Sequence, residues 1–174
     1  MPTPPLHRIS HIVIDVDGTL TDGGIYYDEQ GNELKKFNTR DGAGFFAARH
    51  AGIRLIVLTG RESRTVSRRM ADFQVDVVRQ NVKDKSAWLR AYMAEHGIQR
   101  EELAYVGDDL NDIAAMRLAS FVVCPHDACE EVRAEAHYIS GCKGGEGVFR
   151  DMVAFLLKER GQWAETVKAV YTFD

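Results

Sequence analysis

The chain has 174 residues, of which 45% are hydrophobic and 28% charged, a composition that excludes collagen-like and intrinsically disordered proteins. With 22 Lys and Arg against 26 Asp and Glu, the net charge of −4 disfavours general attraction to nucleic acid or anionic membranes. The longest apolar runs, five or six residues, cannot span a bilayer. The start, MPTPPLHRIS, lacks the apolar stretch of a secretory signal, so we expect a cytoplasmic protein.

After a Pro-rich start at 1–8, which predicts a loose end, short apolar runs alternate with amphipathic patterns. The apolar runs are rich in β-branched residues and predict buried strands at 11–16, 53–60, 75–78, 103–107 and 121–124. The intervening segments have helical spacing and predict helices at 44–52, 63–73, 84–97 and 111–120. Since parallel strands need helical crossovers, this alternation predicts an α/β fold with a doubly wound, mostly parallel sheet.

Residues 23–38 depart from the alternation and predict a β-hairpin inserted after the first strand, with its turn at Gln30-Gly31-Asn32. One side of this hairpin is apolar and includes Ile25, Tyr27, Leu34 and Phe37. An isolated hairpin would leave strand edges exposed, so we expect pairing between subunits, with folding over its own sheet as the alternative.

A Gly-rich C-terminal tail occupies residues 141–174. It begins with a loop around Gly144, Gly145 and Gly147, continues into an amphipathic helix up to residue 161, and ends in a helical stretch at 162–171. The loop is interpreted either as a mobile flap over the site or as a plain turn before the helix. All segments together predict one domain over 1–174.

Polar side chains follow four of the predicted strands, and the carboxyl ends of parallel strands are where open α/β sheets bind ligands. Taken along the chain, the residues that follow these strands are Asp15 and Asp17; Thr59 and Gly60; Lys85; and Asp108, Asp109 and Asp112. Clustered carboxylates need a cation, and oxygen ligands favour Mg²⁺ over zinc or copper. Mg²⁺ beside hydroxyls, backbone N–H groups and a Lys suits a phosphate.

Asp15 and Asp17 flank Val16, so in an extended strand both carboxylates would lie on one face. One could attack phosphorus and form an aspartyl-phosphate, while the other protonates the leaving alcohol and later activates water. A plain turn after a strand is the structural alternative for this pair. The distance in sequence from Asp17 to Thr59 is 42 positions, too few for the hairpin, one helix and also a lid domain.

The other motifs are each ambiguous when taken alone. Thr59 and Gly60 can present a hydroxyl and N–H groups to an oxyanion, or can form an ordinary strand-to-helix turn. Lys85 lies near a helix start, where the helix dipole disfavours a cation, which suggests a task such as neutralising phosphate and nucleophile. Asp108, Asp109 and Asp112 could hold and support a metal, or could cap a helix. Because each of these motifs follows its own predicted strand, their combination favours a phosphate and metal site over separate structural roles.

The segments DVDGTLTDG (15–23), LTGR (58–61) and VGDDLND (106–112), together with Lys85, resemble the four signatures of haloacid dehalogenase-type phosphatases. The resemblance implies that Asp15 is the nucleophile and Asp17 the general acid and base. It implies phosphate binding by Thr59, Gly60 and Lys85. It further implies Mg²⁺ held by Asp15, the Asp17 backbone carbonyl and Asp108, with Asp109 and Asp112 in support.

Residues 22–44 and the segment GGEGVFRD (144–151) resemble a narrower group within that family, the 3-deoxy-D-manno-octulosonate (KDO) 8-phosphate phosphatases of lipopolysaccharide precursor synthesis. Members of this group lack a cap domain and form homotetramers, which implies a site completed by a neighbouring subunit. A sister group hydrolyses the 9-phosphate of the nine-carbon sugar acid KDN and typically has Glu after Thr-Gly. Arg61 at that position favours the KDO enzymes.

An acidic sugar phosphate carries several negative charges, and planar Arg side chains suit carboxylate recognition. We expect Arg61, Arg40 and Arg68 to bind substrate, although Arg68 would also fit the solvated face of a helix. A receiver-like phospho-acceptor module is an alternative function, disfavoured because Asp17 supplies an acid and base for turnover. A phosphomutase is disfavoured because no cap is present.

Three cysteines, Cys124, Cys129 and Cys142, cannot all pair with one another within the chain. A zinc site at Cys124, His126 and Cys129 is the alternative to unreactive thiols, and it lacks a second ligand pair at zinc-finger spacing.

Overall fold

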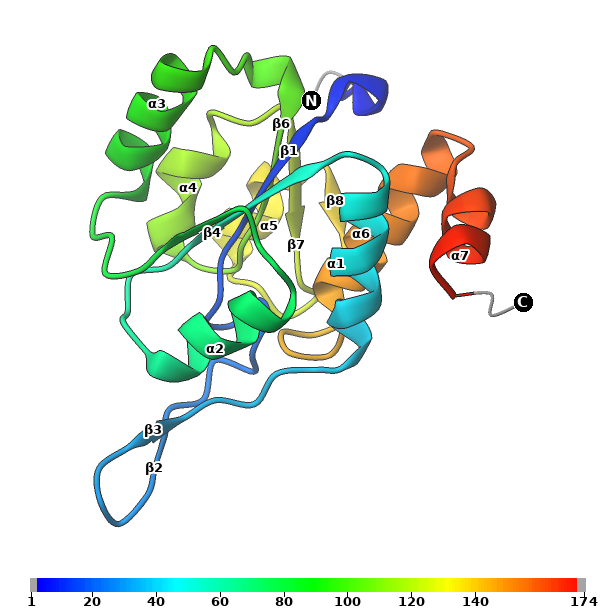
Figure 1. Ribbon diagram of the computed structural model, residues 1–174. Helices are drawn as coiled ribbons and strands as arrows, with labels where there is room; N and C mark the ends of the chain where they lie inside the picture. The colour runs from blue at the N-terminus through cyan, green and yellow to red at the C-terminus, as the bar shows by residue number, and fades with distance from the viewer. Residues whose placement is uncertain (1–2, 172–174) are drawn as a thin grey trace.

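The computed structural model describes residues 3–171 and is built on a six-stranded parallel sheet (Figure 1). The strand order is β5-β4-β1-β6-β7-β8. The bounds are β1 His11–Ile14, β4 Arg54–Leu58, β5 Val77–Arg79, β6 Leu103–Val106, β7 Phe121–Cys124 and β8 Tyr138–Ile139. The first strand in the sequence, β1, therefore lies in the interior of the sheet, with β4 and β6 as its parallel neighbours.

Helices cover both faces of this sheet (Figure 1). One face carries α1 (Arg40–His50), α2 (Arg64–Asp72) and α6 (Val148–Glu159), with α7 (Trp163–Tyr171) packed on α1 and α6. The other face carries α3 (Lys85–His96), α4 (Leu110–Met116) and α5 (Glu130–Glu135). Stacked rings of Phe45 and Phe73, 4.3 Å between centroids, contribute to the first core. The predicted doubly wound α/β fold is confirmed.

The N-terminal segment is more ordered than its Pro-rich sequence predicts. Leu6–Arg8 forms a short 3₁₀ helix, and the Arg160 guanidinium donates hydrogen bonds to the carbonyls of Leu6, at 2.8 Å, and Ile9. The expectation of a loose end is therefore wrong for residues 6–8, because a side chain distant in sequence binds their backbone. Across residues 3–171, no helix is long and apolar enough to cross a membrane.

Helix α1 begins at Arg40, whereas the sequence pattern predicted a start at residue 44. Two glycines, Gly42 and Gly44, weaken the helical signal of its first turn. Gly44 is needed there, because a Cβ at this position would lie 2.8 Å from the Cα of Arg150 in α6. The close approach of two helices therefore outweighs local helix propensity.

The hairpin consists of β2 (Tyr26–Tyr27) and β3 (Glu33–Leu34), which pair antiparallel and extend away from the main body (Figure 1). Asp28 organises its turn by accepting hydrogen bonds from the N–H groups of Gln30 and Asn32. Its apolar side chains are exposed, with Tyr27 at 64% and Leu34 at 52%. The hairpin is thus not folded over its own sheet.

The Gly-rich loop before α6 packs against the turn that follows β1 of the same chain. The Gly145 N–H donates to the Thr19 carbonyl at 3.0 Å, and a Cβ at Gly144 would lie 2.1 Å from the Gly18 carbonyl oxygen. Within this chain the loop forms a turn before α6, while its action as a flap stays a prediction. Helices α6 and α7 account for most of the tail.

Asp41 in the first turn of α1 is 2% exposed and joins α1 to α6. Its Oδ1 accepts a hydrogen bond from the Arg150 N–H at 3.1 Å, while its Oδ2 is buried without a hydrogen-bond partner among the described residues. Burial raises the pKa of Asp41 to about 6, although backbone hydrogen bonds from Arg150 and Phe149 oppose the shift.

A raised pKa in the folded state means that Asp41 costs stability once it ionises, so its contribution worsens as pH rises from about 4 to above 6. Asp41→Asn removes this charge. We expect the free energy of unfolding of the variant, relative to that of the wild type, to be about 2 kcal/mol greater at pH 7.5 than at pH 4.5. Urea unfolding at both pH values measures this difference, with Asp72→Asn on the exposed face of α2 as control. A pH-independent difference would contradict the assignment.

Candidate active site

The ends of β1, β4 and β6 meet at a cavity of about 250 Å³. Asp15 follows β1 directly and continues its ladder, since the Asp15 N–H donates to the Val106 carbonyl at 3.0 Å. The residues that line the cavity are Asp15, Asp17, Gly18, Gly23, Thr59, Gly60, Arg61, Asp108, Asp109 and Asn111. Segments predicted to converge from distant parts of the sequence therefore do so.

Beneath the cavity lies a buried network of charges. The Lys85 ammonium, at the start of α3, contacts Asp15 Oδ1 at 2.5 Å and Asp112 Oδ1 at 2.6 Å. The Tyr105 hydroxyl, from β6, donates to Asp112 Oδ1 at 2.7 Å. All three ion-pairing side chains are at most 6% exposed. The network fixes the Asp15 carboxylate through Lys85, which Asp112 on α4 holds in turn.

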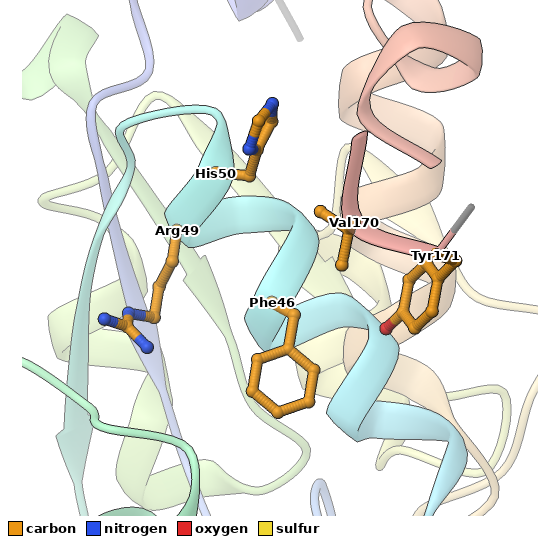
Figure 2. A pocket seen from close by; sticks show the side chains of 5 residues that line it. All are labelled: Phe46, Arg49, His50, Val170 and Tyr171. Atoms are coloured by element: carbon orange, nitrogen blue, oxygen red, sulfur yellow. The ribbon is translucent and has the colours of Figure 1, made fainter. Parts of the chain in front are cut away.

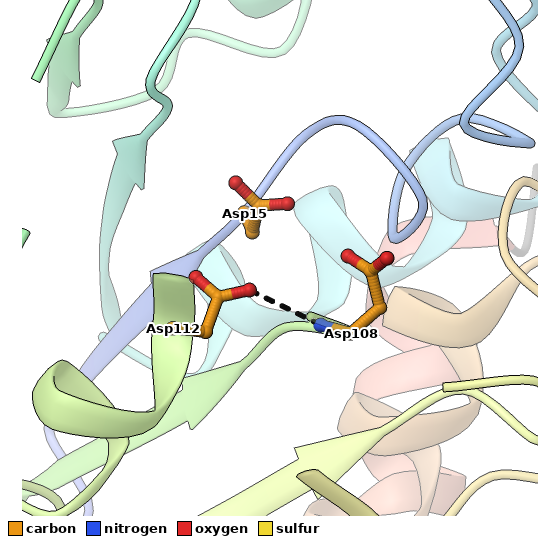
Figure 3. Close-up of side chains that lie close together, drawn as sticks. All are labelled: Asp15, Asp108 and Asp112. Atoms are coloured by element: carbon orange, nitrogen blue, oxygen red, sulfur yellow. Dashed lines mark hydrogen bonds between the residues drawn. The ribbon is translucent and has the colours of Figure 1, made fainter. Parts of the chain in front are cut away.

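Burial dominates the electrostatics of this network. Burial and the neighbouring Asp112 carboxylate raise the pKa of Asp15 well above its ordinary value, although Lys85 opposes the shift. Burial alone would lower the pKa of Lys85, but Asp15 and Asp112 outweigh it and raise that pKa. Lys85 is therefore a permanent cation. One buried ammonium serves two carboxylates, and a third, Asp108, lies beside them (Figure 3).

Asp15, Asp108 and Asp112 each offer an oxygen, and these three atoms lie within 4.8 Å of one another. Burial and the Asp112 carboxylate raise the pKa of Asp108 to about 7, although the Thr19 hydroxyl donates to Asp108 Oδ1 at 3.0 Å. A bound cation would offset both the cost of burial and the mutual repulsion of these carboxylates, so the cluster fits a divalent cation with oxygen ligands.

Asp112 is the member of this cluster whose oxygens already have protein partners. Its Oδ1 accepts from Lys85 and Tyr105, and its Oδ2 accepts from the Asp108 N–H at 3.2 Å (Figure 3). These contacts suit support of the cluster, as the sequence predicted, and leave Asp15 and Asp108 freer to hold a metal. Asp109 caps α4 by accepting from the Leu110 N–H at 2.8 Å, so the capping interpretation is also realised.

The cysteines have no comparable arrangement. Cys124, Cys129 and Cys142 are free thiols. Within residues 3–171, the Asp15, Asp108 and Asp112 cluster is the one group of three or more His, Cys, Asp or Glu side chains close enough to hold a metal. The described part of the chain thus gives no support to a zinc site.

Thr59 and Gly60 lie at the end of β4, across the cavity from Asp108. Thr59 is 1% exposed, and its N–H donates to the Arg79 carbonyl at 3.0 Å, which extends the pairing of β4 with β5. Lys83 donates to the Gly60 carbonyl at 2.8 Å and fixes the turn from outside. The buried Thr59 hydroxyl therefore has a defined place on the cavity wall.

The three arginines predicted to bind substrate lie in different places. Arg61 lines the cavity, where its guanidinium is bound to Glu33 of the hairpin. Arg40 lines a separate cavity of about 420 Å³ beside α6, together with Arg150. Arg68 is exposed on α2 and does not line the cavity at Asp15. Within this chain, only Arg61 of the three is next to the acidic cluster.

Two residues of the hairpin reach the site without any motif in the sequence that predicted them. Lys35 contacts the Asp17 carboxylate, and its ammonium lies 2.9 Å from Glu33 Oε1. The available signal was alternation, because Glu33 and Lys35 share one face of an extended segment while Leu34 and Lys36 share the other.

A larger cavity, of about 540 Å³, lies between α1 and α7 (Figure 2). Its lining residues are Phe46, Arg49, His50, Val170 and Tyr171. Its lining has no carboxylates and includes none of the motif residues at the strand ends. The smaller, more acidic cavity is therefore the candidate active site.

Comparisons with known proteins agree with this geometry. A haloacid dehalogenase-like hydrolase family model matches residues 67–152. The KDO 8-phosphate phosphatase of Haemophilus influenzae is 33% identical over 157 residues, covering 90% of this chain and 87% of the relative. The enzyme of the same name from Escherichia coli is 34% identical over 158 residues, covering 91% and 84%.

Solved structures give the same result. The KDO 8-phosphate phosphatase of Moraxella catarrhalis, crystallised with magnesium ion, phosphate ion and KDO, is 34% identical with a TM-score of 0.91, covering 95% of each chain. The cobalt-bound phosphatase of Haemophilus influenzae is 32% identical with a TM-score of 0.87, covering 92% and 94%. The chain belongs to the haloacid dehalogenase-like hydrolases. Within them it closely resembles the KDO 8-phosphate phosphatases, which lack a cap domain.

Gly18 lies in the turn after β1, beside the acidic cluster, with a φ of +86°. A Cβ there would lie 2.0 Å from Asp108 Oδ2, so Gly18→Ala must displace this carboxylate. We expect Mg²⁺ affinity, measured by titration calorimetry, to fall about 10–100-fold. Gly52→Ala is the matched control, because Gly52 also has a positive φ, +74°, but open space around it. Equal Mg²⁺ affinities in the two variants would contradict the role of Gly18.

Proposed function

We propose that this protein is a Mg²⁺-dependent phosphomonoesterase that hydrolyses KDO 8-phosphate to KDO and phosphate through an aspartyl-phosphate at Asp15. The observation that carries the proposal is the Asp15 carboxylate, held by Lys85 at 2.5 Å at the floor of an open cavity and beside Asp108. The magnesium, phosphate and KDO bound by the Moraxella catarrhalis relative support the choice of cofactor and substrate.

In the first step, an oxygen of Asp15 forms a bond to phosphorus while the bond from phosphorus to the sugar oxygen breaks. Asp17 gives its proton to that leaving oxygen. Asp17 then takes a proton from water, whose oxygen attacks the phosphorus of the aspartyl-phosphate and releases phosphate and the Asp15 carboxylate. Each residue ends the cycle in its starting protonation state.

The remaining residues stabilise charge. The Thr59 hydroxyl, the Gly60 N–H and the Lys85 ammonium would bind the oxygens of the transferring phosphoryl group. Lys85 also opposes the rise in the pKa of Asp15 that burial causes, so it favours the ionised form that a nucleophile needs. Mg²⁺, when held by Asp15, the Asp17 carbonyl and Asp108, would neutralise the facing carboxylates and phosphate oxygens.

The substrate assignment depends on Arg61, which lines the cavity directly after the phosphate-binding turn. Its guanidinium suits a sugar-acid carboxylate, whereas the sister KDN 9-phosphate phosphatases typically have Glu there. KDN 9-phosphate and other acidic sugar phosphates are therefore the alternative substrates. A receiver-like module has less support, because Asp17 is present and the relatives are hydrolases.

We expect the active form to be a homotetramer in which hairpins of neighbouring subunits pair and cover the cavities. The exposed apolar side chains of β2 and β3, including Tyr27 at 64% and Leu34 at 52%, support this assembly. An isolated two-stranded hairpin would gain stability from such pairing. Arg40 and Arg68 would then have a place at a subunit boundary.

The function is tested by phosphate release from KDO 8-phosphate, KDN 9-phosphate and glucose 6-phosphate with Mg²⁺. We expect the wild type to prefer KDO 8-phosphate, and Asp15→Asn to be inactive on all three because no nucleophile remains. Asp17→Asn should be slower by about 10²–10⁴-fold. Circular dichroism checks that both variants fold. Activity in Asp15→Asn would refute the nucleophile, and equal rates on the three phosphates would refute the substrate.

The assembly is tested by light scattering coupled to size-exclusion chromatography. Leu34→Asp places a charge in the exposed apolar face of the hairpin, so we expect the tetramer to dissociate and phosphate release to fall with it. Lys36→Gln is the control, because it changes a 65% exposed side chain on the same face of the segment without placing a negative charge there. A wild-type protein that runs as a monomer would contradict the proposed assembly.

A further inference from the structure

Lys35 is a buried cation that the proposed mechanism does not use. Its side chain is 1% exposed, although the hairpin around it is largely in solvent. The ammonium contacts Asp17 Oδ1 and lies 2.9 Å from Glu33 Oε1. Burying a Lys side chain is costly unless its charge is paired, so these contacts account for its position.

The contact restricts the chemistry of Asp17 at the level of single atoms. An ammonium has three N–H donors and no acceptor, so the oxygen that it contacts cannot also present a proton toward it. A proton on Asp17 is therefore favoured on Oδ2, which leaves the lone pairs of Oδ1 to the ammonium. Asp17 lines the cavity and its side chain keeps 26% exposure, so it can reach a ligand there. Lys35 thus fixes both the orientation of the carboxyl group and the oxygen that delivers the proton.

A second link joins this contact to the opposite wall of the cavity. Glu33 binds Lys35 through Oε1 and the Arg61 guanidinium through Oε2. Lys35 and Glu33 thus form a continuous bridge from Asp17, after β1, to Arg61, after β4. The base of the hairpin is fixed by a β-bridge between Thr21 and Phe37. The segment that carries Lys35 is therefore held at both of its ends.

From this bridge we infer that Lys35 is a positioning residue for the general acid Asp17, and that the hairpin assembles the leaving-group side of the site. The inference depends on the proposed phosphatase activity. Loss of Lys35 would leave Asp17 and Glu33 as facing carboxylates without their shared cation. Proton delivery to the leaving oxygen should then suffer, while attack by Asp15, which Lys85 orients, should not.

The experiment compares Lys35→Met with the wild type on a series of aryl phosphates whose phenol leaving groups differ in acidity. The measured quantity is kcat/KM, which reports the first phosphoryl transfer. A poor leaving group needs the acid and a good one does not. We expect a loss of about 10–100-fold for the least acidic phenol and under about 3-fold for the most acidic. Asp17→Asn should show the same steepened dependence on leaving-group acidity.

Lys36→Met is the matched control, since Lys36 is the adjacent Lys on the exposed face, and its series should parallel the wild type. Lys35→Gln keeps an N–H donor, so its dependence of kcat/KM on leaving-group acidity should lie between those of the wild type and Lys35→Met. This variant tests the role of Lys35 if Lys35→Met fails to fold. An equal loss for every phenol, or no loss, would overturn the role of Lys35 and leave the phosphatase assignment intact. A wild type inactive on all phosphates would overturn both.

Discussion

The site depends on one constraint: three carboxylates share a water-poor edge of the sheet with a single buried ammonium. Lys85 satisfies Asp15 and Asp112, while Tyr105 and the backbone of Asp108 complete the coordination of Asp112. Burial and the Asp112 carboxylate raise the pKa values of Asp15 and Asp108. The three carboxylate oxygens lie within 4.8 Å of one another, so the arrangement fits a divalent cation whose charge would offset their repulsion.

The hairpin adds a second layer to this site. The buried network below the cavity orients Asp15 from inside the sheet, whereas Glu33 and Lys35 approach Asp17 from outside. The two carboxylates that flank Val16 are thus held by cations from unrelated elements, Lys85 on α3 and Lys35 on the hairpin. This separation allows two acids two residues apart to have different environments and different tasks.

The sequence alone predicted the features of the fold and the site that depend on local residue patterns. Buried β-branched runs predicted five of the six sheet strands, and motifs after those strands predicted the acidic cluster. It was insufficient where tertiary contacts decide. The edge strand β8 and the short helix α5 are too brief to show periodicity, and the first turn of α1 is hidden by Gly42 and Gly44. The partners of Asp17 and Arg61 come from the hairpin, whose approach no local spacing encodes.

The contact between the Gly-rich loop and the turn after β1 also has an evolutionary consequence. With Gly144 too close to the Gly18 carbonyl for any side chain, neither backbone can be altered alone. Descendants that acquire a new substrate should therefore diversify at the hairpin tip, where Gly31 has open space, and inherit the loop and turn as one unit.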